Sequence, residues 1–205
     1  DNCLARALSS KIIQNNQSAE FVSPEHENKK NPITKVLMNP PFALDKTDEK
    51  EYRFIDHALN QMEDGGMLFS ILPCSAMVKQ GGYKEWRERL LKCNTLTSVI
   101  TFSPELFYPQ SAPPTLGIII KKGIPHAKEQ KVLWIRALND GYRKVKGKRL
   151  FSGKVPNDLG KTKEILQSFF VNPKSSIKNI PEFQKATPVD FQDEQLELVP
   201  ENYLD

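Results

Sequence analysis

The chain has 205 residues, of which 39% are hydrophobic, and a net charge of +4, so it is long enough to bury the core of one sizeable domain and is not a disordered tail. Its three cysteines, Cys3, Cys74 and Cys93, are far apart and form no CxxC pair, which argues against a disulfide framework and against a zinc site. We therefore expect a reducing, cytoplasmic location and no metal. No apolar run reaches the roughly 18 residues that cross a membrane, and no signal-peptide pattern is present, so we expect no membrane partner.

The N-terminal part of the chain predicts a helix and then a short strand. Apolar residues recur at helical spacing between Leu4 and Ile13, which favours a helix over residues 4–16. A polar, proline-containing stretch follows, and residues 33–38 then form a mainly apolar run of strand length. This predicted strand leads directly into Asn-Pro-Pro-Phe at residues 39–42.

A second helix is predicted over residues 48–64, where apolar side chains again share one face. Asp48 and Glu51 have the spacing of an N-cap residue and its N3 partner, and Gly65 and Gly66 are expected to end the helix. The apolar run MLFSILP that follows is typical of a central parallel strand.

The alternation of strand and helix then continues. Residues 81–94 predict a helix with Trp86 facing inward, and residues 96–103 predict the next strand. This order requires a parallel sheet. The connection PELFYPQSAPP is too short and too rich in proline to form a helix, so TLGIIIKKG should return antiparallel as a hairpin partner, with VLWIRA as one more strand. We therefore expect an α/β fold with a doubly wound, mostly parallel sheet and a terminal antiparallel hairpin.

The part of the chain after about Asn139 is expected to be an extension. Polar turns alternate there with one amphipathic helix near LGKTKEILQSFF, and the acidic end resembles a connection to a further domain. The predicted division is therefore residues 1–138 as one domain and residues 139–205 as an extension or linker.

The basic side chains are unevenly distributed. Between Lys121 and Lys154, eleven lysines and arginines face two acidic residues, whereas from Glu182 onward seven acidic residues face one lysine. A solvated surface loop explains the basic stretch as well as an anionic partner does; the functional interpretation is nucleic acid, since clustered cations neutralise phosphates. The candidates for contact with a DNA backbone are Arg143, Lys144, Lys146, Lys148 and Arg149.

The Asn-Pro-Pro-Phe stretch lies at the carboxyl end of a predicted strand, where doubly wound sheets bind ligands. An exocyclic amine such as that of adenine is a poor nucleophile because its lone pair is delocalised into the ring. The Asn39 side-chain carbonyl and the main-chain carbonyl of Pro40 can accept its two hydrogens and direct the lone pair toward an electrophilic methyl group. The prolines at 40 and 41 remove two competing N–H donors, and Phe42 offers a flat face to a flipped-out base. The alternative is an ordinary proline turn.

The motif VLMNPPF resembles the catalytic motif of the S-adenosylmethionine-dependent adenine-specific DNA methyltransferases, especially the methylation subunits of type I restriction–modification systems. FIDHALNQMEDGGMLFSILP is similar to the helix and strand that follow the motif in that family, and ELFYPQSAPPTLGIIIKKG to its final hairpin. ALNDGYRKVKGKRL is similar to the segment that leads away from the catalytic domain, so the resemblance extends to about residue 150. It implies that residues 1–138 are the C-terminal part of a Rossmann-like catalytic domain, the second half of its sheet.

The resemblance implies a role for each matching position. Asn39 and Pro40 would bind the target amino group, and Phe42 would stack on the adenine. Phe107 is the candidate for a second wall of the base site, with Tyr108 as the runner-up; the alternative for both is an ordinary core or loop aromatic. The implied partners are DNA and a specificity subunit or target-recognition domain.

The chain departs from the family pattern on the cofactor side. None of its ten glycines lies in a GxG arrangement, so the glycine-rich loop that surrounds S-adenosylmethionine in the family is absent from this sequence. Asp1 matches the acidic residue that contacts the cofactor ribose, although it can equally be only the point at which the chain is cut. Three alternatives stay open: methylation of an RNA adenine, methylation of a protein glutamine amide, and a methyltransferase fold that serves as a non-catalytic binding or assembly module.

These features predict that the 205-residue chain alone binds S-adenosylmethionine weakly or not at all, because the loop around the methionine end of the cofactor is missing. Calorimetric titration checks this expectation. Binding in the micromolar range would contradict it.

Overall fold

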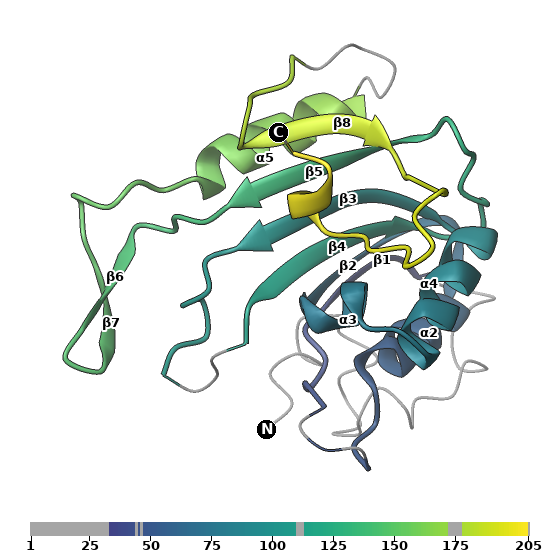
Figure 1. Ribbon diagram of the computed structural model, residues 1–205, viewed down its shortest axis with the longest axis horizontal. Coiled ribbons are helices and arrows are strands. Elements are labelled where there is room, and N and C mark those ends of the chain that lie inside the picture. The colour runs from purple at the N-terminus through teal and green to yellow at the C-terminus, as the bar shows by residue number, and fades with distance from the viewer. Residues whose placement is uncertain (1–32, 44, 46, 110–112, 172–177, 205) are drawn as a thin grey trace.

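The computed structural model describes residues 33–43, 45, 47–109, 113–171 and 178–204 (Figure 1). The helix predicted over residues 4–16 lies outside the described residues, and so does Asp1.

The first strand, helix and strand are β1 (Ile33–Met38), α2 (Glu51–Gln61) and β2 (Met62–Pro73). β1 pairs with β2 in parallel, as expected for two strands joined by a crossover helix. The remaining elements are α3 (Ser75–Val78), α4 (Gly82–Cys93), β3 (Thr95–Phe102), β4 (Thr115–Lys121), β5 (Lys131–Ala137), β6 (Tyr142–Val145), β7 (Lys148–Phe151), α5 (Leu159–Val171), β8 (Gln184–Pro188) and the short 3₁₀ helix η4 (Pro200–Asn202).

Both predicted ends of the second helix are wrong. The helix begins at Glu51, so Asp48 is not its N-cap residue, and Lys50 at that position makes no side-chain capping bond. At the other end, the glycines at 65 and 66 belong to β2. The N–H of Gly65 donates to the Lys122 carbonyl and the N–H of Lys122 donates to the Gly66 carbonyl, each at 2.9 Å. The two glycines therefore pair with the chain that leaves β4, and they do not end the helix.

The six-stranded sheet has the order β1-β2-β4-β3-β5-β8. β1, β2, β3 and β5 run in one direction, whereas β4 is antiparallel to both of its neighbours and β8 is antiparallel to β5. The predicted α/β fold is confirmed, and so is the antiparallel return of TLGIIIKKG. β4 lies between β2 and β3, and its residues are buried up to Lys121, which explains its continuous apolar run.

Helices cover both faces of this sheet. On one face, Ile55 of α2 and Trp86 of α4 pack against strand residues such as Leu68 and Val99, together with apolar residues of the segment after β8. On the other face, Phe169 of α5 packs with strand residues that include Ile100, Leu133 and Ile135. The confirmed amphipathic helix α5 thus completes the second layer (Figure 1).

The carboxyl ends of the parallel strands carry the chain segments of interest. The turn 39–43 follows β1, the loop 103–109 follows β3, and the hairpin β6–β7 follows β5. This two-stranded antiparallel hairpin stands out from the body of the molecule at that edge (Figure 1). The later strand β8 returns to pair with β5, and the division into residues 1–138 and 139–205 stays a prediction.

Gly117, in the middle of β4, provides a test of this packing. An ideal Cβ there would lie 2.8 Å from Phe69 Cε2 and 2.9 Å from Phe102 Cε2, side chains of the two neighbouring strands. Gly117→Ala is therefore expected to destabilise the fold by about 1–3 kcal/mol through overpacking, as measured by urea unfolding. Gly160→Ala in α5 is the matched control, because its Cβ would meet nothing within 4 Å. Equal unfolding midpoints for the two variants would contradict this account.

Candidate active site

The turn Asn39–Phe42 leaves β1 with a side-chain acceptor that has no partner. Asn39 Oδ1 is buried and accepts no hydrogen bond from any described residue. An asparagine that starts an ordinary turn accepts from the N–H two residues on, and here that position is Pro41, which has no N–H. A buried acceptor without a donor costs roughly 1–3 kcal/mol, which a ligand amino group would recover. The turn therefore has a carbonyl oxygen that none of the described residues uses.

Two aromatic rings from separate segments meet beside this turn. Phe42 comes from the turn after β1 and Phe107 from the loop after β3, and their ring centroids lie 5.9 Å apart with an interplanar angle of 86°. Tyr108 lies beneath a different side chain, because Lys144 Nζ is 3.9 Å from its ring centroid. The structure thus brings Phe107, the first of the two aromatic candidates, into contact with Phe42.

The buried carboxylate of Glu51 fixes the far end of the turn. Glu51 is 1% exposed; its Oε1 accepts the N–H of Ala43 at 2.7 Å, and its Oε2 accepts the hydroxyl of Tyr83 at 2.7 Å. Burial, and then this hydrogen bond, raise the pKa of Tyr83. Sequence reasoning assigned Glu51 only a capping role, since spacing does not reveal which helix a side chain will reach. The residue connects α2, α4 and the turn.

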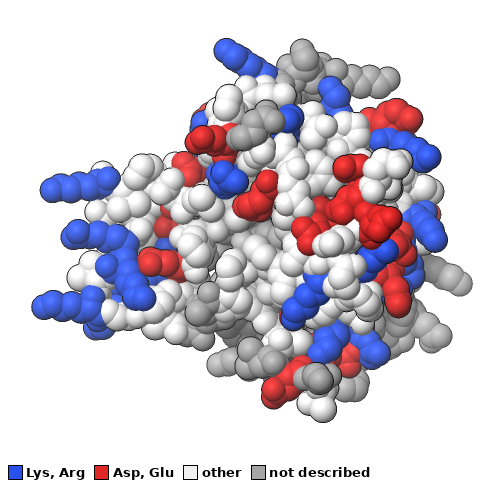
Figure 2. All heavy atoms as spheres, viewed as in Figure 1, with Lys and Arg blue, Asp and Glu red and all other residues white. Residues whose placement is uncertain are grey.

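The five basic candidates all lie on the hairpin β6–β7, which the sequence did not predict. Its two-residue loop, Lys146 and Gly147, has φ values of 44° and 79°, the geometry of a type I′ turn. The Lys-Gly pair is the sequence feature that could have indicated this hairpin. It indicates a hairpin less strongly than Asn-Gly does. Figure 2 shows lysine and arginine side chains gathered over this hairpin, with no comparable acidic cluster beside them in that view.

The five cations differ in exposure. Four of them are solvent-exposed: Arg143, Lys144, Lys146 and Lys148. Arg149 has only 14% of its side chain exposed and is paired with Asp140, whose side chain is 8% exposed.

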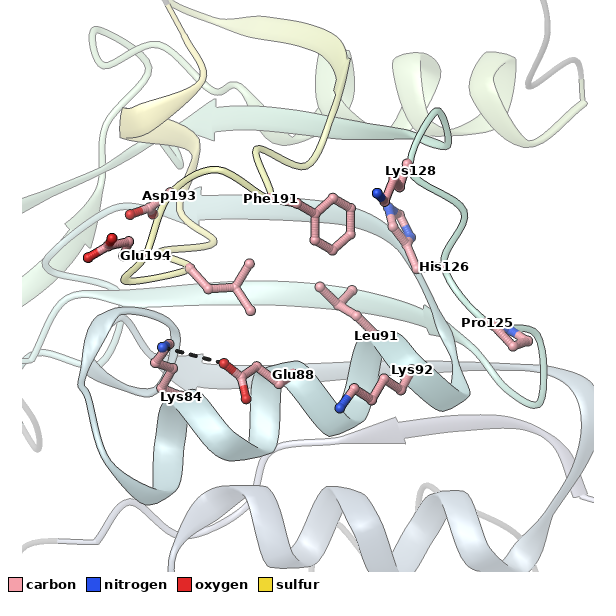
Figure 3. A pocket seen from close by; sticks show the side chains of 11 residues that line it. Lys84, Glu88, Leu91, Lys92, Pro125, His126, Lys128, Phe191, Asp193 and Glu194 are labelled. Atoms are coloured by element: carbon pink, nitrogen blue, oxygen red, sulfur yellow. Dashed lines mark ion pairs between the residues drawn. The ribbon is translucent and has the colours of Figure 1, made fainter.

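A cavity of about 540 Å³ lies elsewhere, between α4, the chain before β5 and the segment after β8 (Figure 3). His126 is buried in its wall, and burial lowers the pKa of the imidazole. None of the predicted site residues lines this cavity. The turn at Asn39 is the stronger candidate for the active site, because the predicted groups converge at the carboxyl edge of the sheet. The cavity has apolar walls and a rim of mixed charge.

Among the residues that the structure describes, other reactive groups do not form a second catalytic arrangement. Cys74 follows β2 at the same edge, but burial raises the pKa of its thiol to about 11, so it is protonated at neutral pH. Within the described part of the chain, no group of three or more His, Cys, Asp and Glu side chains is placed to hold a metal ion. No described helix is long and apolar enough to cross a bilayer.

The fold of the chain is similar to part of a methyltransferase subunit of known structure. The methyltransferase subunit of a type I restriction–modification system from Streptococcus thermophilus superimposes with a TM-score of 0.63 at 18% identity, over 86% of this chain and 39% of that chain. The type IIG restriction endonuclease BpuSI superimposes with a TM-score of 0.59 at 14% identity, over 91% of this chain and 22% of that one.

The family described as N-6 DNA Methylase matches residues 2–204, and the chain belongs to that family. Its sequence is also 35% identical, over 115 residues, to the type II restriction enzyme and methyltransferase RM.BcgI of Heyndrickxia coagulans. That match covers 54% of this chain and 18% of the relative, so the chain spans a small part of the length of RM.BcgI.

The Glu51 connection generates a stability prediction. Tyr83→Phe leaves the buried Oε2 of Glu51 without its donor, so we expect a loss of about 1–3 kcal/mol in the free energy of unfolding at neutral pH. Because the folded protein raises the pKa of Tyr83 above its ordinary value of 10.0, this stabilisation is complete below pH 10 and is lost as the pH rises through the folded-state pKa. Tyr142→Phe, at a residue that is 46% exposed, is the control. Unfolding curves that coincide for the two variants would rule the connection out.

Proposed function

We propose that this chain supplies the base-binding side of an adenine-specific DNA methyltransferase of a restriction–modification system. The enzyme would transfer a methyl group from S-adenosylmethionine to the exocyclic amino group of adenine. The observation that carries the proposal is the buried Oδ1 of Asn39 at the carboxyl edge of the sheet, which has no partner among the described residues and lies in the same turn as Phe42, whose ring contacts Phe107.

In this proposal the turn binds the amino group through two acceptors. Asn39 Oδ1 and the carbonyl of Pro40 would each accept one amino hydrogen, which withdraws the nitrogen lone pair from the ring and directs it outward. Since none of the described residues donates to Oδ1, no hydrogen bond among them has to break before this acceptor binds the base. Catalysis by these residues is therefore positioning and electrostatics, without a proton relay.

The aromatic pair would hold the adenine ring. At 86° to one another, the rings of Phe42 and Phe107 form a corner and not a parallel slot. A base that stacks on Phe42 would therefore meet Phe107 at its side. Stacking on an aromatic side chain contributes roughly 1–3 kcal/mol per base, enough to offset much of the cost of flipping a base out of the duplex. Tyr108, the runner-up for this wall, follows Phe107 in the same loop and lies beneath Lys144.

The cofactor would supply an electrophilic methyl group. Among the described residues no glycine-rich GxG loop is present to cradle it, and Asp1, the predicted ribose contact, lies outside them. The described residues therefore fit the acceptor side of the reaction and do not by themselves fit the cofactor.

The exposed face of the hairpin β6–β7 would bind the DNA backbone. Arg143, Lys144, Lys146 and Lys148 are exposed there, at the edge of the sheet that also carries the base-binding turn. Arg149, the fifth predicted contact, differs from these four because its side chain is largely buried and paired with Asp140. Each phosphate contact would release counterions, so affinity should fall steeply with salt.

The wider setting follows from the family. The description N-6 DNA Methylase favours DNA over an RNA adenine and over a glutamine amide, and it favours an enzyme over a non-catalytic module. The partners would be DNA and a specificity subunit or target-recognition domain, reached through the extension proposed for residues 139–205 beyond a catalytic part at 1–138. A cytoplasmic location suits an enzyme that acts on chromosomal DNA.

Asn39→Ala in the full-length protein tests the proposal. Removing one preorganised hydrogen-bonding group from a reaction centre typically lowers kcat by about 10²–10³-fold, and we expect a loss of that size in adenine methylation. Binding of S-adenosylmethionine, measured by calorimetry, should be largely retained, because Asn39 faces the amino group. Asn60→Ala, at an exposed position of α2, is the control and should methylate normally. Equal loss of methylation and cofactor binding in Asn39→Ala would mean that the turn is structural.

A further inference from the structure

We propose that Arg149 is a positioning residue, not a phosphate contact: it joins the DNA-binding hairpin to the loop that carries the second aromatic wall of the base site. This inference rests on the proposed function and adds to it a physical coupling between the DNA backbone and the flipped base.

The guanidinium of Arg149 is committed to two partners inside the protein. Its Nη1 donates to the carbonyl of Leu106 at 3.0 Å, and its Nη2 is paired with Asp140 Oδ2. Both side chains are largely buried, at 14% exposure for Arg149 and 8% for Asp140. Because Asp140 compensates its charge, Arg149 attracts a phosphate only weakly. Lys148, one position away, is exposed and can contact a phosphate.

Asp140 also fixes the start of the hairpin. Its Oδ1 accepts the N–H of Tyr142, the first residue of β6, at 3.1 Å. The Tyr142 ring lies 5.1 Å from the Arg149 guanidinium, so β6 and β7 are both bound to the same ion pair. Gly141, between Asp140 and Tyr142, has a φ of 81°, a conformation that suits glycine at this bend.

The other end of the connection is the base-side loop. Leu106, which accepts the bond from Arg149, directly precedes Phe107, and Phe107 contacts Phe42. The hairpin makes a second contact with the same loop, because Lys144 Nζ lies 3.9 Å from the Tyr108 ring centroid. A movement of the hairpin is therefore transmitted to Phe107 through the Leu106 carbonyl.

This arrangement assigns different roles to neighbouring cations. Lys148 would set affinity and its salt dependence, since it releases counterions on binding DNA. Arg149 would set the position of Phe107 and hence the rate of the chemical step, because small misplacements at a reaction centre are costly. Lysine cannot replace it, since an ammonium lacks the planar fork that reaches Asp140 and Leu106 together.

The test is Arg149→Lys in the full-length protein, which keeps the charge and removes the fork. We expect kcat for DNA methylation to fall about tenfold or more, while the slope of log affinity against log salt is unchanged. Lys148→Ala should instead weaken DNA binding, with the salt slope reduced by about one. Arg89→Lys is the matched control, because Arg89 also pairs with an aspartate, Asp56 at 2.9 Å, but on the exposed surface of α4.

Hydrogen exchange provides a readout that does not depend on activity. The amides of Leu106 and Tyr108 donate within the loop to the carbonyls of Ser103 and Glu105, each at 3.0 Å. Arg149→Lys should speed exchange of these amides about tenfold without DNA, and Arg89→Lys should not. Unchanged exchange and unchanged kcat in Arg149→Lys, or a salt slope reduced by about one in Arg149→Ala, would overturn the inference. A wild-type protein that methylates no DNA would instead refute the proposed function, and exchange would still decide the connection.

Discussion

The structure of the candidate site depends on one constraint: the side-chain carbonyl of Asn39 must stay buried and yet accept no hydrogen bond from the described part of the chain. The prolines at 40 and 41 help to satisfy this constraint, because neither has the backbone N–H that ordinarily donates to the asparagine of such a turn. Glu51 of α2 fixes the far end of the turn, since its two carboxylate oxygens accept hydrogen bonds from the Ala43 N–H and the Tyr83 hydroxyl. An unpaired acceptor would be a defect in a plain turn. In an amine-binding turn it is the functional group.

The sheet order converts this local feature into a site. Two strands, β2 and β4, lie between β1 and β3, so the segments after β1 and β3 must cross the carboxyl edge to meet. The contact between Phe42 and Phe107 closes that distance. The hairpin after β5 reaches the same loop through Arg149, so three separate segments share one edge of the sheet and one set of contacts.

Much of this arrangement could be predicted from residue patterns, and the remainder depends on tertiary contacts. Apolar runs located β2 and β4, and the proline-rich connection between β3 and β4 indicated an antiparallel return, because these signals are local. Glu51 was misassigned because its partner Tyr83 lies on another helix. Arg149 was indistinguishable from its basic neighbours, since only the folded chain brings Leu106 to it. The ends of α2 depended in the same way on the pairing of the segment around Gly65 with the chain after β4.

The central claim is that the turn at Asn39 binds the amino group of a DNA adenine. The most direct measurement is to incubate the full-length protein with unmethylated genomic DNA and S-adenosylmethionine labelled in its methyl group, and then to separate the nucleosides of the digested DNA. The account predicts label in N6-methyladenine. Label in cytosine derivatives, in protein or in RNA, or no label in any nucleoside, would contradict it.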